Sequence, residues 1–191
     1  VTNTAQIPVG SSVVVIGTGG VGLNSVQGAA LSGARAVIAI DLNNSKLDAA
    51  SAFGATHTIN PAETDPIAAV KAITDGRGAD YVFVTVGSAK AMEEAIGYLC
   101  KVGTLVVVGM PPTGALSAFE TGEFANNSQR FLGSKMGSTC LQTDIPRLID
   151  LYQQGRLKLD ELITNRYPLE QINEAIAEVN RGEALRNVIV F

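Results

Sequence analysis

Four glycines stand among six consecutive residues early in the chain, in the run Gly17-Thr18-Gly19-Gly20-Val21-Gly22. Glycine loses more conformational freedom on folding than any other residue, so this run is costly unless something must approach the backbone closely. In a G-x-G-x-x-G run the first glycine permits a tight turn, the second admits a diphosphate, and the third lets helix and strand pack. N–H groups at the helix start and the positive end of the helix dipole would hold the anion.

An acidic residue follows at the spacing that this chemistry requires. Asp41 ends an apolar stretch, 19 positions beyond Gly22. A carboxylate there accepts hydrogen bonds from ribose hydroxyls and repels a 2′-phosphate, which favours NAD over NADP. Lys46 could donate to the same ribose, although a solvated helix lysine is an alternative interpretation. Together these features predict a dinucleotide site, against the alternative of a strand-to-helix corner that needs small residues.

The elements that would position these residues alternate along the chain. Apolar runs predict strands at 13–16, 36–41, 57–60, 81–87, 103–110 and 130–137, and helical patterns lie at 21–31, 46–53, 67–73 and 89–99. Parallel strands need crossover connections, which are right-handed, so this order predicts an α/β fold with a doubly wound parallel sheet. Val86-Gly87 and Val108-Gly109 end the fourth and fifth strands, at the edge where such sheets bind ligands.

The pattern changes after about residue 137. Thr143 is expected to cap a helix that runs to Gln154, and residues 187–191 form a last strand. A second amphipathic helix between them, ending at Gly182, would carry Leu169, Ile172, Ile176 and Val179 on one side. Residues 111–128 are interpreted as a long polar connection. We therefore expect a dinucleotide-binding domain at 1–137 and a separate C-terminal segment at 138–191.

Composition excludes several other classes. The net charge of −4 without a basic block disfavours nucleic-acid binding, and no apolar run is long enough to span a membrane. Cys100 and Cys140 are far apart and outside any C-x-x-C pair, so we expect a reducing, cytoplasmic location and small buried or half-buried thiols. His57, the single histidine, is interpreted as structural. The chain does not begin with Met, which suggests a piece of a longer protein.

Several runs in order resemble medium-chain zinc-dependent alcohol dehydrogenases. They are IPVGSSVVVIGTGGVGLNSVQGA, AIDLNNSKLDAASAFGATHTIN, VVVGMPP, GSKMGS and the closing GEALRNVIVF. The resemblance implies a Rossmann fold and a C-terminal segment that belongs to the catalytic domain. It also implies an NAD-dependent hydride transfer between an alcohol and the nicotinamide.

The resemblance assigns cofactor contacts residue by residue. It implies that Gly17, Gly19, Gly20 and Val21 line the approach to the diphosphate, next to Gly22 of the same turn, and that Asp41 and Lys46 hold the adenosine ribose. It further implies that Thr85 and Val86 flank the cofactor, that the backbones of Val108, Met110 and Met136 reach the nicotinamide amide beside Gly109, and that Arg186 pairs with the diphosphate.

In this family the catalytic zinc is held by Cys, His or Glu, and Cys of an N-terminal domain that would precede this chain. We therefore expect no metal ligand and no catalytic residue here, and NAD binding without turnover by the chain alone. Expected partners are NAD(H), a small alcohol or aldehyde in the parent enzyme, and further copies in a homo-oligomer that covers exposed apolar surface.

Three alternatives remain at this point. A zinc-free quinone oxidoreductase would share the architecture but would take NADPH, against which Asp41 argues. A non-enzymatic NAD-binding module would apply if the chain is complete in the cell. A methyltransferase can pair a glycine loop with a second-strand acid but need not keep Gly22 or the two further glycine loops.

Overall fold

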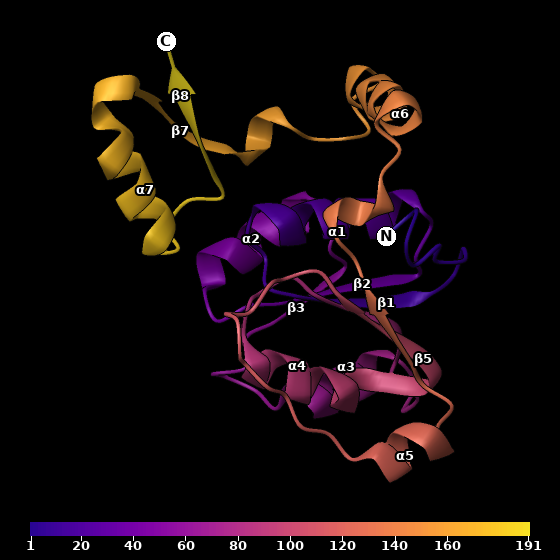
Figure 1. Cartoon of the computed structure of the whole chain (residues 1–191). Helices are drawn as coiled ribbons and strands as arrows, with labels where there is room; N and C mark the ends of the chain where they lie inside the picture. The colour runs from indigo at the N-terminus through magenta and orange to yellow at the C-terminus, as the bar shows by residue number, and fades with distance from the viewer. The chain divides into compact units, whose positions relative to one another are not determined.

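The computed structural model describes residues 1–191, which form two compact units, Val1–Thr139 and Cys140–Phe191 (Figure 1). The first unit contains the glycine run, and the second contains the C-terminal helices. None of the helices combines the length and the apolar character that crossing a bilayer requires.

The first unit is built on one six-stranded sheet. Its strands are β1 (Ser12–Ile16), β2 (Ala36–Ile40), β3 (His57–Ile59), β4 (Ala79–Val84), β5 (Leu99–Val107) and β6 (Arg130–Gly133). The spatial order is β3-β2-β1-β4-β5-β6, and every neighbouring pair is parallel. This is the strand order of a Rossmann-like fold, and the prediction of a doubly wound parallel sheet is confirmed.

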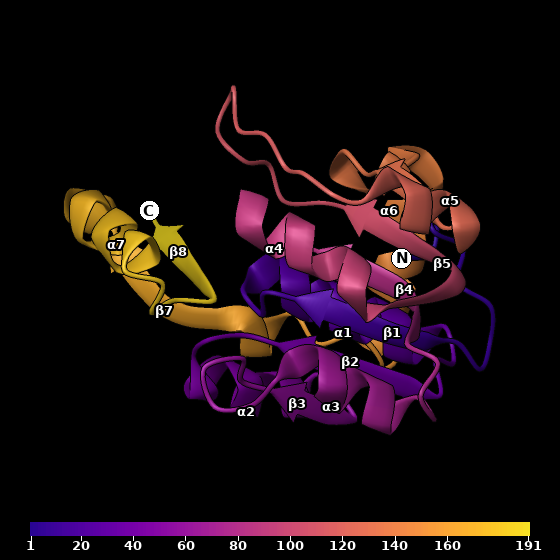
Figure 2. The same cartoon turned by 90° about the horizontal axis from the view of Figure 1, so that it is seen from below.

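Helices cover both faces of this sheet. They are α1 (Gly20–Leu31), α2 (Asn44–Ala52), α3 (Pro66–Ile73) and α4 (Ala89–Ala95). Figure 1 shows α1 and α2 on one face and α3 and α4 on the other, and Figure 2 looks onto the sheet from the side of α3 and α4. All five residues of β1 are buried, because both of its faces are covered. Val14 and Ile16 pack in one cluster with Val70 of α3 and Met92 of α4.

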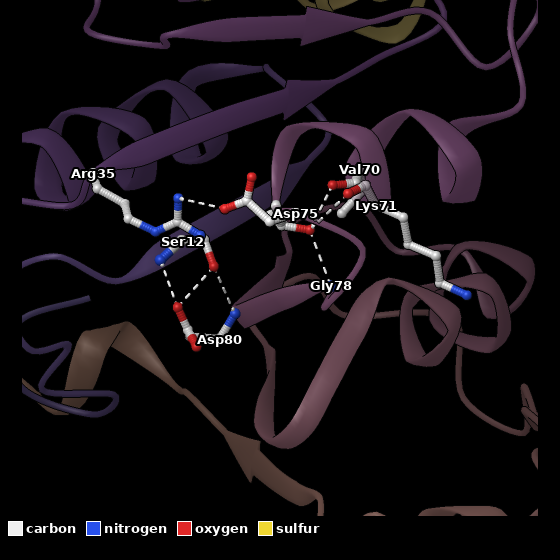
Figure 3. A network of polar contacts seen from close by, with 8 residues as sticks. Ser12, Arg35, Val70, Lys71, Asp75, Gly78 and Asp80 are labelled. Carbon is white, nitrogen blue, oxygen red and sulfur yellow. Dashed lines mark hydrogen bonds and ion pairs between the residues drawn. The ribbon is translucent and has the colours of Figure 1, made fainter.

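Polar side chains form hydrogen bonds at the edge of the sheet where β1 and β4 begin, which we call the amino edge (Figure 3). Asp80 accepts hydrogen bonds from the Ser12 amide at 2.7 Å and from the Ser12 hydroxyl at 2.7 Å. The buried Thr74 hydroxyl donates to the Val70 carbonyl at 2.7 Å and accepts from the Gly78 amide at 3.0 Å. The Ser12–Asp80 bonds fix β4 to β1 at the ends opposite to the glycine run, and the Thr74 bonds hold the end of α3 to the turn before β4.

Several predicted boundaries in the first unit are wrong. The fourth helix ends at Ala95, a short 3-10 turn covers Ile96–Tyr98, and β5 begins at Leu99, four residues earlier than expected at 103. Tyr98 and Leu99 are buried, so an apolar stretch that fits a helix is used in a turn and a strand. β6 stops at Gly133, short of residue 137.

The expected polar connection contains one helix, α5 (Thr121–Asn126). Its position is set by an aromatic cluster, in which the Phe119 ring lies 5.3 Å from that of Phe124 and 6.4 Å from that of Phe131. The contact between Phe119 and Phe131 joins the connection to β6, and a local sequence pattern does not show it.

The second unit contains α6 (Leu141–Gln153), β7 (Ile163–Pro168), α7 (Ile172–Asn180) and β8 (Arg186–Val190), with β7 and β8 paired in parallel. β7 was not predicted, and Leu169 lies in a 3-10 turn before α7 instead of within that helix. The predicted cap is also wrong, because Cys140 is the N-cap of α6 and Thr143 lies inside the helix. The Asp144 carboxylate accepts from the Cys140 amide at 2.9 Å, which satisfies that donor.

Candidate dinucleotide site

The glycine run forms a tight turn between β1 and α1. Gly17 has φ +87°, and a Cβ there would overlap the side chain of Val86. A Cβ at Gly22 would overlap the carbonyl oxygen of Gly17, so the start of α1 packs directly on the end of β1. The Thr85 hydroxyl lies beneath the turn and donates to the carbonyls of Ile16 at 2.9 Å and Gly17 at 2.8 Å. Gly17 and Gly22 are therefore required by packing.

Gly19 differs from these two glycines because it faces open space. It is the N-cap of α1 with φ −71° and ψ −171°, and a Cβ there would have no atom within 4 Å. No side chain caps α1, whereas Asn43, Asp65 and Ser88 cap α2, α3 and α4. The uncapped first turn, with Gly20 and the exposed Val21, leaves N–H groups and the helix dipole available to an anion.

Asp41 follows β2 directly and is hydrogen-bonded to the glycine turn. Its Oδ2 accepts from the Thr18 amide at 2.7 Å and from the Thr18 hydroxyl at 3.0 Å. Its Oδ1 accepts from the Asn43 amide at 3.0 Å. The Gly17 amide donates to the Ile40 carbonyl at 2.8 Å, so the backbone hydrogen bonding between β1 and β2 continues into the glycine turn. The half-buried carboxylate is thus fixed beside the helix start. Lys46 is half-buried in the first turns of α2.

Two further loops follow β4 and β5 and are in contact with each other. The amides of Val108 and Gly109 both donate to the Val84 carbonyl at 2.9 Å. A Cβ at Gly109 would overlap the backbone of Val86, and a Cβ at Gly87 would crowd the Met110 carbonyl. Glycine at these two positions allows the loops to meet, while the Met110 side chain is exposed.

Met136 lies after β6, in a 3-10 turn with unusual backbone geometry. Its φ is +50° and that of Ser138 is +53°, a region that bulky residues seldom occupy. The Thr4 hydroxyl holds this segment through hydroxyl contacts to Ser134 at 3.1 Å and Ser138 at 2.9 Å. Such strain is found where the surrounding structure requires one conformation, often at functional sites.

Because the strands are parallel, the ends of β1, β2, β4, β5 and β6 meet at one edge of the sheet, which we call the carboxyl edge. The predicted cofactor contacts of the first unit lie there: Gly17, Gly19, Gly20, Val21, Gly22, Asp41, Lys46, Thr85, Val86, Val108, Gly109, Met110 and Met136. Arg186 is an exposed residue of β8 in the second unit, so its contact with the same ligand stays a prediction.

Sequence reasoning missed Thr18 and Asn43. Thr18 was treated as a spacer between glycines, although its side chain is fully buried and bonded to Asp41. Asn43 also caps α2, since its side chain accepts from the Ser45 amide at 2.9 Å. The cap at Asn43 could have been predicted from the sequence, because Asn directly before a helix is a common N-cap. Thr18 required the tertiary contact.

The thiols and the histidine differ in their surroundings. Burial, and then the nearby charge of Asp80, raise the pKa of Cys100 to about 11. Cys140 is exposed, which corrects the expectation that it is buried or half-buried, and hydrogen bonds from Thr143 lower its pKa. His57 is exposed and its Nδ1 contacts the Thr56 hydroxyl at 2.8 Å. No group of three or more His, Cys, Asp or Glu side chains is arranged to hold a metal ion.

The strand order and the helices on both faces define a Rossmann-like α/β domain, and the comparisons agree with this fold. Residues 20–154 match the sequence model of the family described as zinc-binding dehydrogenase. The chain is 36% identical to an alcohol dehydrogenase class-3 from Cereibacter sphaeroides, covering 100% of this chain and 53% of the relative.

Solved structures give the same result. An alcohol dehydrogenase zinc-binding domain protein from Burkholderia ambifaria superposes with a TM-score of 0.95 at 36% identity, over 99% of this chain and 50% of the other. Benzyl alcohol dehydrogenase from Acinetobacter calcoaceticus gives a TM-score of 0.92 at 34% identity, over 96% of this chain and 50% of the other. The chain belongs to the zinc-binding dehydrogenase family, and it spans about half the length of the curated relatives it matches.

Proposed function

We propose that this chain is the cofactor-binding part of an NAD-dependent, zinc-type alcohol dehydrogenase. The observation that carries the proposal is the open, uncapped start of α1 at Gly19 beside the Asp41 carboxylate. The first feature suits a diphosphate and the second a ribose with a free 2′-hydroxyl. Family membership supports the same proposal.

Each loop of the carboxyl edge has a distinct task in this proposal. The amides at the start of α1 bind the diphosphate, and Asp41 and Lys46 bind the adenosine ribose. Thr85 keeps the glycine turn closed through its hydroxyl, which bonds to the carbonyls of Ile16 and Gly17. The backbones of Val108, Met110 and Met136 orient the nicotinamide amide, and Arg186 pairs with the diphosphate. When bound, NAD supplies an acceptor for hydride at its nicotinamide C4.

The residues of this chain do not fit a zinc site, so we derive no zinc-dependent step from them. In the parent enzyme the substrate would be a small alcohol or aldehyde. We propose that the 191-residue chain alone binds NAD without turnover. Metal-dependent oxidation of a simple alcohol by the purified chain would contradict this part of the proposal.

Calorimetry tests the cofactor directly. The purified chain is titrated with NADH, NADPH and S-adenosylmethionine under the same conditions. The proposal expects saturable binding of NADH and weaker binding of NADPH. Tighter binding of NADPH would favour a quinone oxidoreductase-like enzyme, and saturable binding of S-adenosylmethionine alone would favour a methyltransferase.

We also propose a homo-oligomer in the cytoplasm. β6 is an edge strand with its second side unpaired, and the side chains of Phe131 in β6 and of Phe119, which stacks on it, are exposed. An edge strand with an unpaired side next to exposed apolar side chains favours association between copies of the chain. The two free cysteines are consistent with a reducing compartment. Sedimentation equilibrium that shows a monomer at all concentrations would exclude self-association.

A further inference from the structure

Thr18 makes an unusual double contact with Asp41. Its side chain is fully buried between the two glycines of the turn. Both its amide and its hydroxyl donate to the same carboxylate oxygen, Oδ2, at 2.7 Å and 3.0 Å. The other oxygen, Oδ1, accepts from the Asn43 amide at 3.0 Å. Three donors from two different loops therefore determine how the carboxylate is turned.

The number of acceptor sites on a carboxylate limits what remains for a ligand. Its two oxygens offer roughly four lone-pair sites, and the two Thr18 donors occupy both of those on Oδ2. One site remains, on Oδ1, since the Asn43 amide takes the other. A side chain free to turn about its Cα–Cβ bond could swing its charge away from an added phosphate, but a carboxylate held at both oxygens resists that movement.

We propose that the Thr18 hydroxyl is a positioning group that fixes the Asp41 carboxylate and thereby sets the preference for NAD over NADP. This inference rests on the proposed function. Without the hydroxyl, only the Thr18 amide still holds Oδ2, and the Asp41 side chain can turn more freely about its Cα–Cβ bond. A ribose hydroxyl then meets a less ordered acceptor, and a 2′-phosphate meets a charge that can move away.

The experiment compares dissociation constants for NADH and NADPH, measured by calorimetry on the full 191-residue chain. Thr18→Val removes the hydroxyl at similar volume, and Thr18→Ser retains it. Thr74→Val is the matched control, because Thr74 is an equally buried threonine whose hydroxyl bonds lie at the amino edge. Thermal melting of each variant accompanies the titrations.

We expect Thr18→Val to weaken NADH binding about fivefold to tenfold, and to lower the ratio of the NADPH to the NADH constant by a similar factor. Thr18→Ser should restore the ratio. Thr74→Val should lower the melting temperature and leave the ratio unchanged, which separates positioning from a general loss of stability.

An unchanged ratio in Thr18→Val, with NADH binding retained by the parent chain, overturns the inference and leaves the proposed function intact. An equal change of the ratio in Thr74→Val also overturns it. If Thr18→Val does not fold, Thr18→Ala removes the same hydroxyl without introducing a methyl group beside the carboxylate. A parent chain that does not bind NADH overturns both the inference and the proposed function.

Discussion

The amino and carboxyl edges of the six-stranded sheet differ in whether their polar groups have partners within the protein. At the amino edge, the buried amide and hydroxyl of Ser12 donate to Asp80 (Figure 3). The buried Thr74 hydroxyl also has protein partners. At the carboxyl edge, the start of α1 is left without a side-chain cap, although the three helices that follow it are capped. The paired groups of the amino edge stabilise the fold. The N–H groups at the start of α1 have no side-chain cap, as the proposed binding of a ligand requires.

The glycines of the carboxyl edge divide in the same way. Gly22, Gly87 and Gly109 are required because backbone atoms occupy the space of a Cβ. Gly19 has open space around it, so the fold does not require glycine there. The first group shapes the turns by packing, and under the proposed function Gly19 gives the ligand access to the main chain. Variants can therefore separate folding from binding within one loop.

The largest effect is expected for Gly22→Ala. Alanine normally stabilises a helix relative to glycine, but here its Cβ would overlap the Gly17 carbonyl oxygen. We expect a loss of about 3 kcal/mol or more in the free energy of unfolding, measured by urea denaturation. Gly122→Ala is the control, because that helical glycine has no atom within 4 Å of a Cβ and should gain about 0.5–1 kcal/mol. Similar losses in both would show that the packing argument is wrong.

A smaller effect is expected for Asp80→Ala at the amino edge. It leaves the buried Ser12 amide without its acceptor, which costs about 2 kcal/mol in the free energy of unfolding. Because Asp80 is remote from the carboxyl edge, the affinity for NADH should not change. The matched control is Asp75→Asn, whose exposed ion pair with Arg35 at 3.9 Å should contribute close to nothing.

The Asp80 carboxylate should also make the free energy of unfolding depend on pH. Burial acts to raise the pKa of Asp80, but the two hydrogen bonds from Ser12, with smaller help from Cys100 and Arg77, outweigh it and lower the pKa below 3.8. A lowered folded-state pKa contributes stability that is present above the unfolded value and is lost as pH falls through the folded value. Urea titrations from neutral pH down to about pH 3 should show a shallower acid loss in Asp80→Ala than in the parent chain. Equal slopes would exclude this contribution.

The smallest effect concerns thiol reactivity. Burial raises the pKa of Cys100 to about 11, whereas hydrogen bonds from Thr143 lower that of the exposed Cys140. Since the thiolate is the reactive form, iodoacetamide at neutral pH should label Cys140 first in the folded chain. Mass spectrometry after limited labelling identifies the modified residue. Denaturant should make both thiols react equally, and preferential labelling of Cys100 in the folded state would contradict the structure.

Much of the first unit could be predicted because its signals are local. The buried strands of the sheet are continuous apolar runs, and the glycine turn and Asp41 follow them at fixed spacing. The start of β5 at Leu99 could not be predicted, because an apolar sequence fits both a helix and a buried strand. α5 depends on contacts between Phe119, Phe124 and Phe131, which no local pattern shows.

For the candidate site, too, the sequence indicated the local features and not the tertiary contacts. Residue types and order indicated the glycines and Asp41, but not which glycine is required by packing. The contacts of Thr18 with Asp41 join two loops separated by 23 positions, so only the folded chain shows them. β7, whose sequence ITNRYP mixes apolar and polar residues and ends in proline, gave no clear strand pattern.

The central claim is that a diphosphate lies against the uncapped start of α1, and Gly19→Ser tests it most directly. The backbone of Gly19 is extended, so a serine there can cap the helix and occupy the amides that the ligand needs. We expect an equal or higher melting temperature, together with at least about tenfold weaker binding of NADH by calorimetry. Unchanged affinity for NADH in a folded Gly19→Ser chain would contradict the account.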